Sequence, residues 1–306
     1  VVDYMSDTKL YMGIEVGDAS LKVALLDSAE KRVLKTAVLP TETSPIDDVF
    51  TFESVLQEWM DQNKIEKVES VAVTMTAFRS IVRQVYIPAE ASANVDEYVK
   101  WYLKLITNAD ENAYILDYQV IGGQPSLGLT VLMIAVRKEW VDGLRKGFRN
   151  KALAPASMEV DVLSMLNLMD VANNIKDMEC VIKADTAGVT MMWLSKDNLQ
   201  CLRGVSTLSA WGNEKAYEML AEGIQEQLVK AKDENPSLEV NTLRVCGELA
   251  NDPQFVETLR GKVNDCQLML LDSFSNLRLP VEAENADMVL SCVGAIGCAL
   301  SLVEGV

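Results

Sequence analysis

One pattern occurs twice in this 306-residue chain, about 170 residues apart, and it constrains the fold more than any other feature. Near the N-terminus the apolar runs KLYMGIE, LKVALLD and RVLKTAVL follow one another with turn residues between them, which predicts antiparallel strands. From Cys180 the runs CVIKADTAGVTMMWLS and LQCLRGVS repeat this arrangement around a Gly-containing turn. A helix and a further strand are predicted after each copy. The duplication predicts two similar α/β lobes.

Between the two copies lies a segment with strand, helix and hairpin signals of its own. RSIVRQVYIPAEASANVDEYVKWYLKLITN contains a strand, a break at Pro88 and a helix. AYILDYQVIGG and LGLTVLMIAVR follow it as a hairpin joined by the turn GGQPSLG. Near the C-terminus, MVLSCVGAIGCALSLV is shorter than the roughly 18 residues of a membrane span and predicts a buried closing helix with small residues on one face.

The composition excludes several classes of function. The formal net charge of -17 opposes binding to nucleic acid, and no basic run offsets it. The chain has no histidine, so the commonest general base and metal ligand are missing. The six cysteines include no C-x-x-C pair and lie mostly in apolar runs, which indicates reduced thiols in a cytosolic protein.

Five blocks along the chain carry a resemblance to a known family. They are GIEVGDASLKVALLD, VYIPAEASANVDEYVKWYLKLI, LDYQVIG, VLMIAVRKEWVD and MEVDVLSMLNL. In these blocks the chain resembles the PilM family of type IV pilus assembly, which belongs to the actin-like ATPase superfamily with FtsA, sugar kinases and Hsp70-type chaperones. The first block is similar to the family's first phosphate loop, D-I-G-S-S-x-I-K-hydrophobic, and the others resemble later blocks and occur in the family's order.

The resemblance implies an α/β actin-like ATPase fold with two duplicated RNase H-like lobes and an inserted subdomain of the FtsA and PilM type. The expected division is residues 1–81 for the first lobe, 82–156 for the insertion, 157–179 for the return to the first lobe, and 180–306 for the second lobe. In the family a further subdomain of the second lobe contacts the nucleoside. Here LRGVS passes almost directly into a predicted long helix, so this subdomain is expected to be missing.

The resemblance also implies a site for ATP with Mg²⁺ and no other metal. Glu15 would be the catalytic carboxylate of an active enzyme. The candidate nucleotide-binding residues are Gly17, Asp18, Ala19, Ser20 and Lys22 in the first loop, Asp185, Thr186, Ala187 and Gly188 in the second, and Gly247 and Glu248 in the third.

The three loops depart from the family pattern. Asp18 stands where the family has Ser or Thr, and its charge would repel a phosphate by on the order of one kcal/mol in water. In the second loop, either Lys183 replaces the family's aspartate and Asp185 its glycine, or Asp185 is retained and Gly188 lies one position late. Glu248 replaces the second glycine of the third loop. These changes predict a site poorly suited to ATP and favour ordinary hairpin turns for the first two loops, with working phosphate loops as the alternative.

Two further groups of residues are candidates for function. Glu159 and Asp161 could form a carboxylate dyad near the cleft, although a solvated strand-to-helix junction is the simpler interpretation. Five aromatic residues gather in the predicted insertion, where core packing is the default and a partner peptide is the alternative. They are Tyr86, Tyr98, Trp101, Tyr102 and Tyr118.

These features favour a cytoplasmic, PilM-like scaffold at the inner membrane that has weak or lost ATP hydrolysis. In the PilM family a cytoplasmic tail of the membrane protein PilN docks between the inserted subdomain and the first lobe, so the resemblance implies a similar partner. A homo-oligomer is compatible with the sequence. The alternatives are an active actin-like ATPase of pilus assembly or cell division, and the cytoplasmic part of a type II secretion protein similar to GspL.

Overall fold

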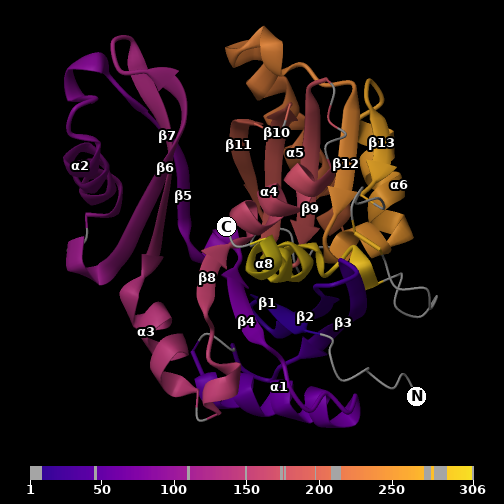
Figure 1. Ribbon diagram of the computed structural model, residues 1–306. Helices are drawn as coiled ribbons and strands as arrows, with labels where there is room; N and C mark the ends of the chain where they lie inside the picture. The colour runs from indigo at the N-terminus through magenta and orange to yellow at the C-terminus, as the bar shows by residue number, and fades with distance from the viewer. Residues whose placement is uncertain are drawn as a thin grey trace.

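A computed structural model describes most of the chain. The described residues are 9–44, 47–108, 111–148, 150–172, 175, 177–196, 198–207, 215–271, 277–278 and 288–304. They form three sheets, two of five strands and one of three (Figure 1). We call the parts built on these sheets lobe 1, lobe 2 and the insertion.

Lobe 1 has the strand order β3-β2-β1-β4-β8. The strands β1, β2 and β3 are antiparallel, and β4 and β8 run parallel to β1. The Asp48 side chain begins α1 by accepting hydrogen bonds from the amides of Phe50 and Thr51. The elements are β1 Leu10–Val16, β2 Ser20–Asp27, β3 Arg32–Pro40, α1 Val49–Gln62, β4 Ser70–Met75, β8 Ser157–Val160 and α4 Asp161–Ala172.

Lobe 2 repeats this arrangement with the order β11-β10-β9-β12-β13. Its strands β9 and β10 are buried along nearly their whole length, as expected for apolar runs covered on both faces. The elements are β9 Glu179–Asp185, β10 Gly188–Ser195, β11 Asn198–Ser206, α5 Ala216–Glu234, β12 Thr242–Cys246, α6 Pro253–Lys262 and β13 Gln267–Leu270.

The insertion is a three-stranded antiparallel sheet, β5-β7-β6, with α2 on one face. It stands beside lobe 2 in Figure 1 and connects to lobe 1 through α3. Buried side chains of α2 and of one face of its sheet form a separate core. Others, including Val82, Leu132 and Val136, join the continuous core that includes both lobes. The elements are β5 Ile81–Ile87, α2 Val95–Thr107, β6 Tyr114–Gln124, β7 Gly128–Arg137 and α3 Lys138–Gly147.

The closing helix α8 (Val293–Glu304) packs closely against lobe 1 and lies between the two five-stranded sheets in Figure 1. A Cβ atom on Gly13 of β1 would lie 1.9 Å from the carbonyl oxygen of Ala295. A Cβ on Gly297 would lie equally close, 1.9 Å, to the carbonyl oxygen of Ser164 in α4. The small residues of this helix therefore permit direct contact with the backbone of lobe 1, as predicted.

The duplication predicted from the sequence is confirmed, and the structure decides the register of the second hairpin. In the first hairpin Glu15 lies opposite Lys22. Two residue pairs nearer the turn, Gly17 lies opposite Ser20 and donates its amide to the Ser20 carbonyl. Lys183 lies opposite Thr190, and Asp185 pairs with Gly188 two pairs nearer the turn. Lys183 is thus equivalent to Glu15, and Asp185 is equivalent to Gly17. The register that retains Asp185 as the family's aspartate is wrong.

Candidate functional site

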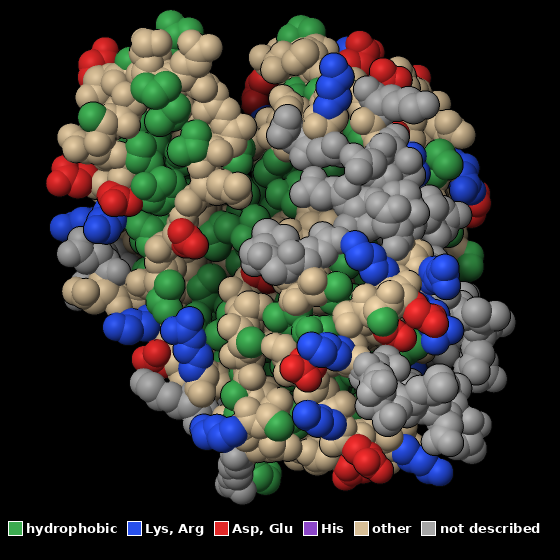
Figure 2. All heavy atoms as spheres, viewed as in Figure 1, with side chains coloured by type: hydrophobic (Ala, Val, Ile, Leu, Met, Phe, Trp, Pro, Cys, Tyr) green, Lys and Arg blue, Asp and Glu red, His purple; other side chains and the backbone are tan. Residues whose placement is uncertain are grey.

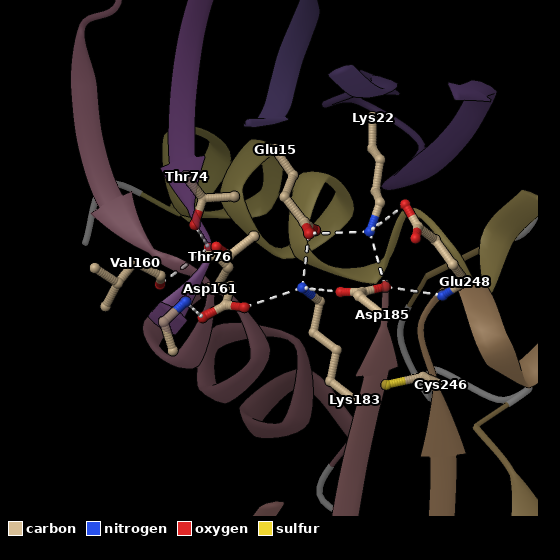
Figure 3. Close-up of polar contacts among 12 residues, drawn as sticks. Glu15, Lys22, Thr74, Thr76, Val160, Asp161, Lys183, Asp185, Cys246 and Glu248 are labelled. Carbon is tan, nitrogen blue, oxygen red and sulfur yellow. Dashed lines mark hydrogen bonds and ion pairs between the residues drawn. The ribbon is translucent and has the colours of Figure 1, made fainter. Parts of the chain in front are cut away.

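Six charged side chains from both lobes meet at the junction between the lobes (Figure 3). Glu15 comes from the end of β1, Lys22 from β2 and Asp161 from the first residue of α4. Lys183 and Asp185 come from the end of β9, and Glu248 follows β12. We call these six residues the buried charge cluster. All except Glu248 are less than 6% exposed.

The two ammonium groups hold the cluster together. Lys183 Nζ lies 2.6 Å from Glu15 Oε1, 2.9 Å from Asp161 Oδ2 and 2.7 Å from Asp185 Oδ2. Lys22 Nζ lies 2.9 Å from Asp185 Oδ1, 3.2 Å from Glu15 Oε1 and 3.3 Å from Glu248 Oε1. Each ammonium therefore has three carboxylate partners, which compensates for the loss of water around it.

The surroundings shift the pKa values of these groups in different directions. Burial raises the pKa of Glu15, and Lys183 and Lys22 offset this only in part. Burial acts against the charged form of Lys183, but Asp161, Asp185 and Glu15 outweigh it and hold its pKa well above the usual range. Burial also acts against the charged forms of Lys22 and Asp185, but their neighbours outweigh it. Asp185 and Glu15 raise the pKa of Lys22, and Lys183 and Lys22 lower the pKa of Asp185. Both lysines therefore remain charged near neutral pH.

The third loop covers one side of the cluster. Gly247 has a φ of 94°, and a Cβ there would lie 2.4 Å from the carbonyl oxygen of Ala184, so this turn requires glycine. The Glu248 amide donates to Asp185 Oδ1 at 2.8 Å. The Glu248 carboxylate accepts from the amide and hydroxyl of Thr186 at 3.1 and 2.8 Å. The side chain at this position therefore binds the second loop itself.

Asp18 also has a partner inside the protein. Its carboxylate lies 2.6 Å from Nε of Arg79, in the short turn that follows β4. The same guanidinium lies over the ring of Trp140 in α3, 5.7 Å from the centroid. Arg137 lies over the same ring, at 5.4 Å. The charge of Asp18 is thus compensated by Arg79, which connects the first loop to the base of the insertion.

Gly188 serves packing between the lobes. A Cβ at this position would lie 2.2 Å from the ring of Phe78, which belongs to the turn after β4. Ala19 and Ala187 complete the two hairpin turns, and Ser20 accepts from Gly17 through its carbonyl at 2.9 Å. The structure thus brings Glu15, Lys22, Asp185 and Glu248 together. Asp18 instead binds Arg79, and Gly188 lies against the ring of Phe78.

The expectation for the pair Glu159 and Asp161 is wrong in both forms. Asp161 is 2% exposed, binds Lys183 and accepts from the amide of Ala77 at 2.9 Å, so its junction is not solvated. Glu159 accepts instead from the hydroxyl of Ser164 at 2.6 Å, and burial raises its pKa. The two carboxylates have different partners and do not form a dyad.

The residues present do not fit Mg-ATP. Glu15 and Asp185, the buried carboxylates beside the phosphate-type loops, are already bound by ammonium groups. The amides of Gly17 and Thr186 bind oxygens of the protein. A triphosphate would therefore meet a cluster with four carboxylates and two ammonium groups, a formal excess of two negative charges if all are ionised. With Lys22 and Lys183 in place, no group of three Asp, Glu, Cys or His among the described residues is disposed to hold a metal ion.

Comparisons with solved structures define the class of fold. A Bacteroides thetaiotaomicron protein described as having an actin-like ATPase fold and unknown function covers 89% of this chain and 94% of its own, at 11% identity and a TM-score of 0.54. The cytoplasmic domain of EpsL, an inner membrane component of the type II secretion system of Vibrio cholerae, covers 92% and 93%, at 11% identity and a TM-score of 0.53. The chain has the actin-like ATPase fold.

The particular resemblance seen in the sequence, to PilM, is confirmed at the level of the fold. The structure of a PilM-PilN type IV pilus biogenesis complex matches 96% of this chain and 98% of its own chain, at 16% identity and a TM-score of 0.73. No protein-family model and no curated protein matches the sequence. In the part of the chain that the structure describes, none of the helices has the length and apolar character needed to span a membrane.

Proposed function

We propose that this chain is a PilM-like scaffold of an inner-membrane assembly platform, for a type IV pilus, competence or secretion system, and that it does not hydrolyse ATP. The likeness to PilM over nearly the whole of both chains supports the first part. The buried charge cluster carries the second part. The proposal places the protein in the cytoplasm, at the membrane through its partner.

The cluster opposes nucleotide chemistry at each point where the fold would need it. A carboxylate that positions Mg²⁺ or a water molecule must be free to do so. Glu15 Oε1 instead contacts both Lys183 and Lys22. A lysine that contacts phosphate must likewise be free, but Lys22 is 1% exposed and has three carboxylate neighbours. Binding a nucleotide would require breaking these pairs, at several kcal/mol.

The partner in this proposal is the cytoplasmic tail of a PilN-like membrane protein. A groove of about 540 Å³ lies within the insertion, where β6 and β7 join α3. Its lining includes Tyr114 and four charged side chains, Arg137, Lys138, Glu139 and Asp142, whose formal charges balance. Figure 2 also shows hydrophobic side chains gathered on the insertion. A tail with apolar residues and charges of both signs has complementary surface here.

Calorimetric titration with Mg-ATP tests the loss of the nucleotide site. We expect no heat of binding at micromolar protein and millimolar nucleotide, and no phosphate release above the buffer rate. Micromolar affinity, together with turnover abolished by Glu15→Ala, would show that the chain is an active ATPase and refute the proposal.

Binding of membrane-protein tails tests the scaffold role separately. Synthetic N-terminal tails of PilN-like proteins are titrated against the wild-type chain and against Arg137→Glu, with Arg260→Glu on the distant helix α6 as the matched control. We expect binding that only Arg137→Glu weakens. The likeness to EpsL favours one further candidate, a type II secretion platform protein. Selective binding of tails from that system would support it.

A further inference from the structure

The buried charge cluster joins the two lobes rather than either lobe to itself. Of its six ion pairs, four cross between lobes: Lys22 to Asp185 and Glu248, and Lys183 to Glu15 and Asp161. The other two are internal, Lys22 to Glu15 within lobe 1 and Lys183 to Asp185 within lobe 2. The crossing pairs are 2.6 to 3.3 Å long and come from both sides of the cleft (Figure 3). Most of the ion pairs of the cluster therefore hold the two lobes to each other.

Lys183 occupies the point where the carboxylates converge. Its Nζ has one oxygen from β1, one from α4 and one from its own strand β9, all within 2.9 Å. Carboxylate oxygens from several segments are the ligands that Mg²⁺ and Ca²⁺ take in proteins. An ammonium group at such a point supplies one positive charge that cannot leave.

The duplication relates Lys183 to Glu15. Glu15 and Lys183 are equivalent residues of the two hairpins, by the register described above. Two carboxylates at these positions would repel each other across the cleft and would need a bound cation between them. With opposite charges, the same two positions neutralise each other at 2.6 Å.

One oxygen of Glu15 adds an independent observation. Oε2 is buried and has no hydrogen-bond partner among the described residues. It faces Gly294 in the first turn of α8, where a Cβ would lie 2.1 Å away. Glu15 is thus bound to the lysines through Oε1 alone, and its second oxygen, which faces α8, has a capacity to bind that the described residues do not use.

We propose that Lys183, assisted by Lys22, is a built-in cation that takes the place of an exchangeable divalent ion and keeps the lobes closed without nucleotide. The inference concerns the same cleft as the proposed function and rests on it, since a site that takes Mg-ATP would not need an internal cation. It predicts that removal of the Lys183 amine creates a metal site.

The test compares Lys183→Ala with the wild-type chain and with Arg244→Ala. The control loses an ion pair to Glu179 that lies within lobe 2, at 2.5 Å. Without metal we expect the melting temperature of Lys183→Ala to fall by about 10 °C. We also expect faster amide exchange in both hairpin turns. Millimolar Mn²⁺ or Mg²⁺ should recover at least half of both losses in Lys183→Ala and neither in the control.

A second variant keeps the test valid if Lys183→Ala does not fold alone. In Lys183→Ala/Glu15→Gln one carboxylate charge is removed together with the ammonium, so the remaining charges are better balanced. We expect this protein to fold and to bind Mn²⁺ at least tenfold more weakly than Lys183→Ala refolded with the metal. An equal response of both variants, or none in either, overturns the inference.

The outcome is separable from that of the nucleotide titration. Binding of Mg-ATP by the wild-type chain would refute the proposed function whatever the variants do. A wild-type chain that ignores nucleotide, combined with a Lys183→Ala variant that ignores divalent cations and keeps wild-type amide exchange, would refute only the built-in cation.

Discussion

Substitution of Gly188 by alanine tests whether this glycine of the second loop is needed for packing or for phosphate. A Cβ there would lie 2.2 and 2.4 Å from atoms of the Phe78 ring, far inside van der Waals contact. Overpacking of this kind costs about 1–3 kcal/mol, and because the ring is 40% exposed and can move, we expect the lower half of that range. The gain of alanine over glycine in a strand, about 0.5–1 kcal/mol, partly offsets it.

A double-mutant cycle isolates the contact. In the wild-type background Gly188→Ala should destabilise the protein by about 1 kcal/mol, whereas in a Phe78→Ala background it should stabilise it by about 0.5 kcal/mol. The difference, about 1.5 kcal/mol, is the coupling to be measured by urea unfolding. Gly261→Ala, with no atom within 4 Å of the new Cβ, is the control and should stabilise both backgrounds equally. An equal effect of Gly188→Ala in both backgrounds would refute the packing role.

Three further predictions concern the core and the cleft. Gly13→Ala should destabilise the protein by about 3 kcal/mol or more in urea unfolding, because its Cβ meets rigid backbone of α8 at 1.9 Å; a cost below that of Gly188→Ala would contradict the close packing. Folding raises the pKa of Lys22 and Lys183 above the ordinary 10.5, so their stabilisation is complete below that pH and is lost as pH rises further. The urea midpoint should therefore fall above pH 10.5, and less steeply in Lys183→Ala; equal slopes would speak against it. Finally, only Cys266 is more than slightly exposed among the six cysteines, so a thiol reagent should label one thiol quickly in native protein and six after unfolding.

The sequence predicts the fold well because its signals are local and repeated. Alternating apolar residues and short turns define the hairpins of both lobes, and the spacing of the copies defines the duplication. The closing helix follows from small apolar residues in one run. Each of these features depends on neighbours along the chain, which a single sequence displays directly.

The site is less predictable because its partners are far apart in sequence. Asp18 reads as an uncompensated charge until Arg79, 61 residues away, is brought beside it. Asp161 resembles an ordinary start of a helix, and only folding places Lys183 next to it. One signal was available: a lysine in the otherwise apolar strand CVIKAD must be paired if that strand is buried. The register of the second hairpin also depended on the turn, where the two interpretations differ by two residues.

Under the proposed function, the closed charge cluster also bears on how an assembly platform that contains this protein is controlled. A protein that hydrolyses nucleotide can be driven around a cycle and can release its partner at a cost in ATP. A scaffold whose lobes are held by its own lysines and that does not hydrolyse nucleotide would have no such supply of work. Its occupancy by partners would then follow mass action alone, so assembly would respond to the amounts of the components present and to their dissociation rates.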